Sequence, residues 1–158
     1  MLARLVLISR TMTLHSYREL ACWQLSVQLR DEIIEITDRP VVALNFKFCQ
    51  QIGGSTRSAV SGIAEGFGRS NREFHRYLEI ALGSLRETEN HIDEALKRRY
   101  LTAAEHHHLR SLAKGAHQAA LGLAHYLERR IRDDVGIRGC SKLRNRADFN
   151  SGNGSNEG

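Results

Sequence analysis

The chain has 158 residues, of which 41% are hydrophobic and 26% are charged. This composition fits one globular domain with a modest core and argues against a second domain. The apolar run Leu5–Ile8 is too short for a membrane-spanning helix, which needs about 18 residues, and for a secretory signal. The three cysteines form no CxxC pair, which indicates neither a disulfide framework nor a zinc knuckle, so we expect a cytoplasmic protein.

The net charge is +5, which favours a polyanionic partner. Only part of this excess lies in the predicted helices, because residues 16–131 contain 16 basic and 14 acidic side chains. The remainder lies in the two flanks. The first eleven residues fit poorly with the helical pattern of the later residues. Residues 1–15 are expected to be an N-terminal extension, with Met12 as an alternative start.

Apolar residues recur at steps of three and four along most of the chain, there is one proline, and no hairpin turn stands out. This pattern predicts an all-α protein. The four predicted helices have these approximate bounds: Ser16–Thr37, Asn45–Glu65, Ser70–Arg99 and Thr102–Ile131. Because the helices are long and their connections short, we expect an antiparallel up-and-down four-helix bundle at residues 16–131.

The first predicted helix starts at Ser16, a good N-cap, and ends before Pro40. Its apolar residues form two neighbouring stripes, where one would suffice to dock the helix on a bundle. The second stripe therefore indicates either a central position or a contact between subunits. For the contact we name Leu20, Trp23 and Val27.

The later helix starts carry stronger signals. Ser70 with Glu73, and Thr102 with Glu105, have the spacing of capping boxes, in which two backbone N–H groups gain side-chain acceptors. From residue 132 the composition shifts to Arg, Asn, Ser and Gly without apolar periodicity, so residues 132–158 are expected to be a disordered basic tail.

The stretch Ser61–Phe74 holds three glycines and Glu65 between two helices. It fits neither phosphate-loop pattern, because no lysine occupies the required position after the glycines and no strand precedes them. Gly66 and Gly68 are better interpreted as C-terminal caps with left-handed backbone geometry. We expect Glu65 to be a surface residue or a partner of Arg69, and a subunit contact if this corner packs against a neighbouring copy.

The histidines do not predict a metal site. Consecutive side chains on a helix point about 100 degrees apart, so His106, His107 and His108 cannot share one ion. No spacing supports a catalytic triad or an acid/base pair. We therefore expect neither an enzyme nor a bound cofactor or metal.

Basic side chains cluster near helix ends, where they suit either phosphate contacts or simple solvation. The candidate nucleic-acid-binding residues are Arg69, Arg72, Arg76, Lys97, Arg98, Arg99, Arg129 and Arg130. A further basic group lies between Arg138 and Arg146 in the expected tail. Oligomerisation would present each cluster several times.

Two runs carry a family resemblance: Gly62–Arg69, which reads GIAEGFGR, and Tyr77–Ser84, which reads YLEIALGS and is preceded by Phe74 and followed by Glu87. With weaker likeness at both ends, about residues 16–128 resemble the bacterial four-helix-bundle proteins encoded in intervening sequences of 23S ribosomal RNA genes. The resemblance implies a ring-shaped homo-oligomer, with a pentamer expected, and no enzymatic activity.

A related group implies a more specific role. The accessory variability proteins of diversity-generating retroelements are similar basic bundles that bind a reverse transcriptase and its RNA. The resemblance therefore implies nucleic-acid binding, with two alternatives: the retroelement role, or a protein-interaction scaffold. Two positions depart from the family pattern, since Gly53-Gly54 stands where paired arginines are usual and Gly62 replaces an asparagine.

Overall fold

The computed structural model describes the backbone of residues 14–150 and the side chains of residues 14–135. Within residues 14–150 it contains helices and no strand, so the all-α prediction is confirmed. The elements are a short 3-10 turn and five α-helices: η1 (Tyr17–Glu19), α1 (Ala21–Thr37), α2 (Pro40–Ala43), α3 (Phe46–Gly66), α4 (Asn71–Lys97) and α5 (Ala103–Asn150).

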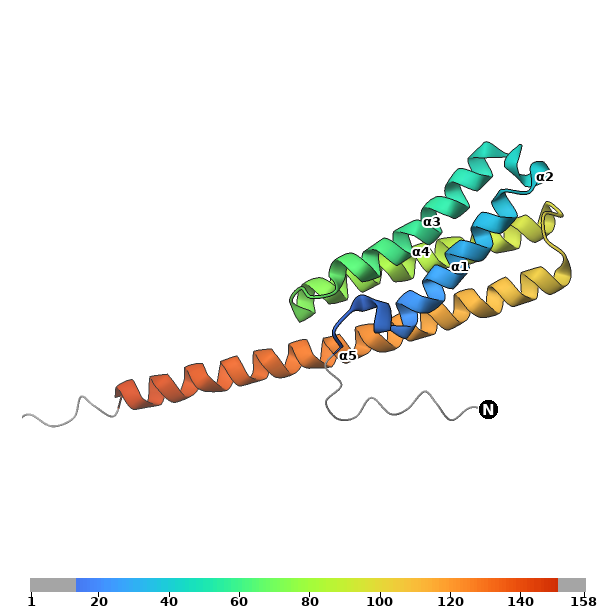
Figure 1. The fold of residues 1–158 in the computed structure, drawn as a ribbon. Coiled ribbons are helices and arrows are strands. Elements are labelled where there is room, and N and C mark those ends of the chain that lie inside the picture. The colour runs from blue at the N-terminus through green and yellow to red at the C-terminus, as the bar shows by residue number, and fades with distance from the viewer. Residues whose placement is uncertain (1–13, 151–158) are drawn as a thin grey trace, which may run out of the picture.

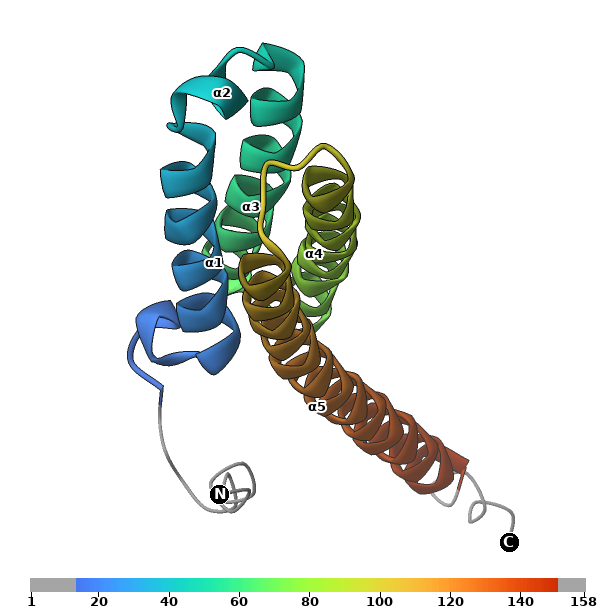
Figure 2. The ribbon, with the colours of Figure 1, turned by 90° about the vertical axis from the view of Figure 1, so that its right-hand side faces the viewer.

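Each of the four long helices packs against two of the others. Both α1 and α4 pack against α3 and α5 (Figures 1 and 2). The colours in Figure 1 show the chain doubling back at each connection between long helices. The core lies between them, and its largest fully buried side chains include Leu29, Ile33, Ile52, Ile63, Leu78, Leu85, Ile92 and Leu109.

Three helix starts agree with the sequence prediction. The Asn45 side chain accepts from the N–H of Phe48 at 3.2 Å, and Ser70 forms a complete capping box with Glu73. At α5 the Thr102 Oγ1 accepts from the N–H of Glu105 at 3.2 Å, and the Glu105 carboxylate accepts from the Thr102 N–H at 2.7 Å.

The first helix starts later than predicted. Ser16 caps η1 rather than α1, because Leu20 adopts an extended conformation (φ −74°, ψ 124°) and interrupts the helix. The expected break before Pro40 is real, but the chain then forms the short helix α2 with Pro40 in its first turn. This position suits proline, whose missing N–H would lack an intrahelical partner there.

Where the sequence predicts a disordered tail from residue 132, the backbone continues α5 without a break to Asn150. No proline interrupts this stretch, so nothing in its covalent structure forces the helix to stop. The last part of α5 extends past the bundle (Figure 1). Residues 1–13 and 151–158, including the expected N-terminal extension up to Thr13, lie outside the described part of the chain.

Candidate nucleic-acid interface

The α3–α4 corner, residues 66–73, brings three of the candidate arginines to one place. Gly66 is the last residue of α3, and a Cβ added there would lie 2.6 Å from Phe74 Cδ2 and 2.7 Å from Tyr77 Cβ. Gly68 has φ +81°, as its predicted capping role requires. The left-handed prediction is wrong for Gly66, which is helical and is needed for the close approach of α3 and α4.

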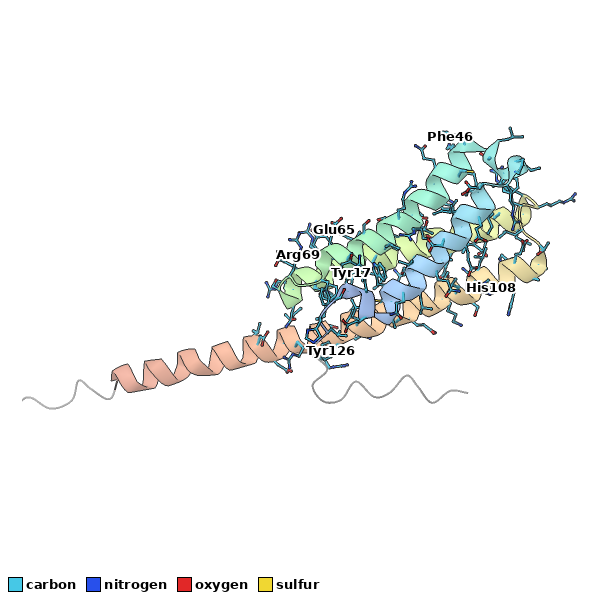
Figure 3. All side chains as sticks on the ribbon, in the orientation of Figure 1. Tyr17, Phe46, Glu65, Arg69, His108 and Tyr126 are labelled. Carbon is cyan, nitrogen blue, oxygen red and sulfur yellow. The ribbon has the colours of Figure 1, made fainter. Side chains whose placement is uncertain are left out.

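Arg69 is held in place by two contacts. Its Nε donates to the main-chain carbonyl of Glu65 at 2.8 Å, and its Cζ lies 5.0 Å from the centroid of the Tyr77 ring. The predicted link between Arg69 and Glu65 therefore exists, but through the backbone. The guanidinium also approaches the Glu73 carboxylate at 4.0 Å, while 46% of the Arg69 side chain stays exposed (Figure 3).

Arg72 and Arg76 differ from Arg69 because neither approaches a described carboxylate at ion-pair distance. Both are exposed, and neither takes part in an ion pair among residues 14–135. They lie in the first turns of α4, near its positive N-terminal end, where an anion is favoured. The corner therefore presents two arginines without an ion pair to a described residue, beside the exposed carboxylates of Glu65 and Glu73.

A shallow hollow of about 260 Å³ lies beside this corner. It is lined by Arg69, Glu73, Arg76, Tyr77 and Ile80. The Glu73 carboxylate accepts a hydrogen bond from the Ser70 hydroxyl at 2.6 Å. This hydrogen bond, followed by one from the backbone N–H of Ser70, holds the pKa of Glu73 below its ordinary value. One carboxylate thus remains ionised among the arginines.

The second basic cluster, Lys97, Arg98 and Arg99, lies at the opposite end of α4. Its distance from Arg72 along the helix is about 37 Å at 1.5 Å per residue. The Arg98 Nε donates to the Glu94 carboxylate at 2.7 Å, a contact that leads the causes lowering the Glu94 pKa.

Arg99 closes α4 through its backbone. It has φ +60°, and the adjacent N–H of Tyr100 donates to the carbonyl of Ala95 at 2.9 Å. This is the Schellman ending, in which glycine usually takes the left-handed position. The Arg99 backbone therefore has a structural role, while its side chain is exposed.

Arg39 adds a fourth cation at this end, where it ties α2 to the start of α5. Its guanidinium donates to the Glu105 carboxylate at 2.7 Å and to the Tyr100 carbonyl at 3.3 Å. The hydrogen bond from Arg39, followed by those from Thr102, lowers the Glu105 pKa to about 2.

Arg129 and Arg130 lie at the end of the bundle that holds the α3–α4 corner, and not at the end that holds Arg39 and Arg98. Two ion pairs set the register of α4 against α5, Asp93–His106 at 2.8 Å and Glu89–Arg110 at 2.7 Å. Extending this register by helical geometry places the start of α4 level with residues near Arg130. Both arginines are exposed and have no ion pair among residues 14–135.

The residues named for a subunit contact occupy different environments. Leu20 is 6% exposed and belongs to the protomer's own core. Trp23 is half-buried with its ring 5.2 Å from that of Tyr17, and Val27 is also half-buried. The helix α1 packs against two long helices, α3 and α5, as each of the other long helices packs against two, so it does not take a central position. Glu65 is exposed.

A different apolar surface was missed from the sequence. Val41, Leu44 and Phe46 are 71%, 87% and 74% exposed, and they lie together along α2 and the start of α3. Figure 3 shows Phe46 at the end of the bundle away from Arg69. The sequence shows that these residues are apolar, but only the tertiary structure shows that no core residue covers them.

The histidine run has a structural role that its spacing did not reveal. His106 Nε2 lies 2.8 Å from Asp93 of α4, and His108 Nε2 lies 2.8 Å from Glu32 of α1, so the run links α5 to two helices. His107 is exposed. Across the part of the chain that the structure describes, no three His, Cys, Asp or Glu residues gather as metal ligands would.

No helix within the described residues is long and apolar enough to cross a membrane.

Comparison with known proteins identifies the family. No curated protein matches the chain. The model of one family, described as 23S rRNA-intervening sequence protein, matches residues 18–119. This match spans α1 to α4 and the first part of α5. The chain therefore belongs to the 23S rRNA-intervening sequence protein family.

Proposed function

We propose that this protein is a non-enzymatic, homo-oligomeric four-helix bundle, antiparallel and up-and-down, that binds RNA or DNA mainly through phosphate contacts. The observation that carries the proposal is the α3–α4 corner, where Arg72 and Arg76 are exposed without an ion pair among residues 14–135. Solvated arginines without carboxylate partners can exchange counterions for phosphates at little cost. Arg129 and Arg130, at the same end of the bundle, are further candidates for phosphate contacts.

Oligomerisation strengthens the proposal. The apolar surface formed by Val41, Leu44 and Phe46 is exposed in the protomer, and such a surface usually marks an interaction site. A cyclic assembly would repeat the arginine corner around a ring, so that one nucleic-acid strand contacts several copies. The expected oligomer is a pentamer. Multi-angle light scattering that finds only a 17.9 kDa species at micromolar concentration would contradict this part.

The binding experiment is a gel-shift titration at two salt concentrations. We expect binding to RNA and DNA at low salt, with affinity falling steeply as salt rises, because each released counterion adds to the slope. Absence of a shift with both nucleic acids at low salt would rule the proposal out.

The second candidate is a protein-interaction scaffold, such as a partner of a reverse transcriptase. The exposed apolar surface of Val41, Leu44 and Phe46 favours it. The two candidate functions depend on different surfaces: a scaffold binds its partner through the apolar surface, and a nucleic-acid-binding protein binds through the arginine corner. Leu44→Ser together with Phe46→Ser is expected to abolish partner binding by a scaffold. If nucleic-acid binding is direct, the same changes leave the affinity of each protomer's corner unaltered.

A further inference from the structure

The hollow beside the α3–α4 corner combines charge with a flat surface. Four of its lining residues, Glu73, Arg76, Tyr77 and Ile80, succeed one another at steps of three, one and three on α4. This spacing places them along a single face of the helix. Arg69 reaches the same face from the connection after α3.

Arg69 and Tyr77 form a layered platform. The guanidinium lies over the tyrosine ring with 5.0 Å between Cζ and the ring centroid, and its Nε is fixed by the Glu65 carbonyl. A planar cation held in this way can receive a second flat group on its outer face. The Arg69 side chain is 46% exposed, so part of it is open to solvent, and Figure 3 shows it at the end of the bundle away from Phe46.

Ile80 supplies an apolar edge to the platform. It is 50% exposed although isoleucine favours burial. Arg76 precedes it by one helical turn and takes part in no ion pair among residues 14–135, although Glu73 lines the same hollow. A ligand that covers Ile80 would therefore bring its anionic group within reach of Arg76.

These features together select a ligand. A flat ring joined to a phosphate matches a platform and an apolar edge beside a free guanidinium. The volume of about 260 Å³ falls just below the range of sites for whole small molecules, about 300 to 1,000 Å³, and suits one ring rather than several. In a duplex the bases are stacked and paired, so only an unpaired nucleotide can offer its ring face.

We propose that this hollow binds one unpaired nucleotide of a single-stranded nucleic acid, with the base stacked on Arg69 over Tyr77 and against Ile80, and the phosphate on Arg76. This inference rests on the proposed nucleic-acid function and narrows it. Arg72 then contacts the neighbouring phosphate.

Glu73 makes the inference sharper because it opposes the ligand. Its carboxylate is ionised and lines the same hollow, so it repels the phosphate. A glutamine at this position keeps the capping-box geometry. Glu73→Gln should therefore tighten binding, a result that a purely structural role of Glu73 does not produce.

The test compares two probes by fluorescence anisotropy at low salt. One is a labelled oligouridylate of about 12 nucleotides, and the other is a duplex RNA of equal length. Tyr77→Leu is expected to weaken single-strand binding at least about fivefold, the smallest effect usual for loss of base stacking. Duplex binding should be unchanged. Tyr77→Phe keeps the ring and should bind as the unaltered protein does.

Further variants separate the platform from general effects. Ile80→Ala should weaken only the single-strand complex, and Ile34→Ala, which shortens a similarly exposed isoleucine of α1, should leave both complexes unchanged. Thermal unfolding of each variant controls for misfolding. If Tyr77→Leu fails to fold, Ile80→Ala still decides the question, because only an unpaired base is expected to cover Ile80.

The outcomes distinguish the two levels of the proposal. Equal losses for single strand and duplex, or no gain from Glu73→Gln, would overturn the unpaired-nucleotide site while leaving phosphate binding intact. A change of oligomeric mass in Ile80→Ala would assign the hollow to a second copy of this chain instead, and would also overturn it. No binding of either probe would remove the proposed function itself.

Discussion

The two ends of α4 carry similar basic clusters, yet they use their arginines differently. At the α4–α5 end, Arg98 bonds to Glu94, Arg39 bonds to Glu105, and Arg99 closes the helix with its backbone. At the α3–α4 corner, Arg72 and Arg76 have no ion pair with a described residue. The α4–α5 end keeps two exposed cations without an ion pair among residues 14–135, Lys97 and Arg99, while Arg98 and Arg39 are paired with carboxylates, so charge count alone does not identify a binding surface.

The largest expected effect comes from disrupting the α3–α4 corner itself. In Gly66→Ala the new Cβ would lie 2.7 Å from Tyr77 Cβ, an atom that cannot swing away, so α3 and α4 must separate. We expect a loss of about 1 to 3 kcal/mol in the free energy of unfolding, as overpacking usually costs. Urea denaturation measures it.

Gly54→Ala is the matched control in the same helix. A Cβ there meets nothing within 4 Å, so the substitution should stabilise the protein by about 0.5 to 1 kcal/mol through helix propensity. If both variants lose the same stability, close packing at Gly66 is not the cause.

The charges of the two ends provide the next comparison. Arg72→Gln combined with Arg76→Gln should weaken RNA binding about tenfold at low salt and reduce the salt slope by about 0.7 to 0.9 for each phosphate that is no longer neutralised. Arg98→Gln should change binding much less, because Glu94 already neutralises that guanidinium. Titrations at several salt concentrations check both. A larger effect of Arg98→Gln would move the interface to the other end.

A smaller effect is expected where Arg99 closes α4. Its φ of +60° is unfavourable for a residue with a Cβ, so Arg99→Gly should raise the free energy of unfolding by about 1 kcal/mol or less. Thermal unfolding provides the measurement. Destabilisation would instead mean that the exposed side chain matters more to the fold than the backbone strain.

The smallest effect is a pH dependence of the Arg39–Glu105 contact. The pKa of Glu105 falls from 4.5 to about 2 on folding, so this contact stabilises the protein fully above pH 4.5. The contribution is lost as the pH falls from 4.5 towards 2. Its size is below about 1 kcal/mol because the pair is partly exposed.

Arg39→Gln tests this by comparing unfolding at pH 6 and near pH 3. The variant should be less stable than the unaltered protein at the higher pH, and the gap should narrow in acid. Thr102 still bonds to Glu105, so part of the acid sensitivity remains. A gap that stays constant would show that ionisation of Glu105 is not involved.

Much of the fold was predictable because its signals are local. Helix starts at Asn45, Ser70 and Thr102 depend on side chains that reach the first turn of their own helix. Apolar spacing likewise identifies which face of each helix is buried. The end of α5 was not predictable in this way, because loss of amphipathic spacing removes a packing face without ending the helix.

The candidate site was predictable only in part. Sequence placed Arg69, Arg72 and Arg76 together, because a short turn keeps them near one another. It did not reveal the hollow with Tyr77 and Ile80, since α4 periodicity gives no measure of what covers its outer face. The exposed surface of Val41, Leu44 and Phe46 was missed for the same reason.

By itself, the sequence determined an all-α chain, its capping boxes and the clustering of basic residues, because these depend on contacts within one or two helical turns. The tertiary structure decided which arginines are compensated, since Arg39 and Arg110 meet carboxylates on other helices. The tertiary structure also requires glycine at position 66, because α3 and α4 approach too closely there to leave space for a Cβ.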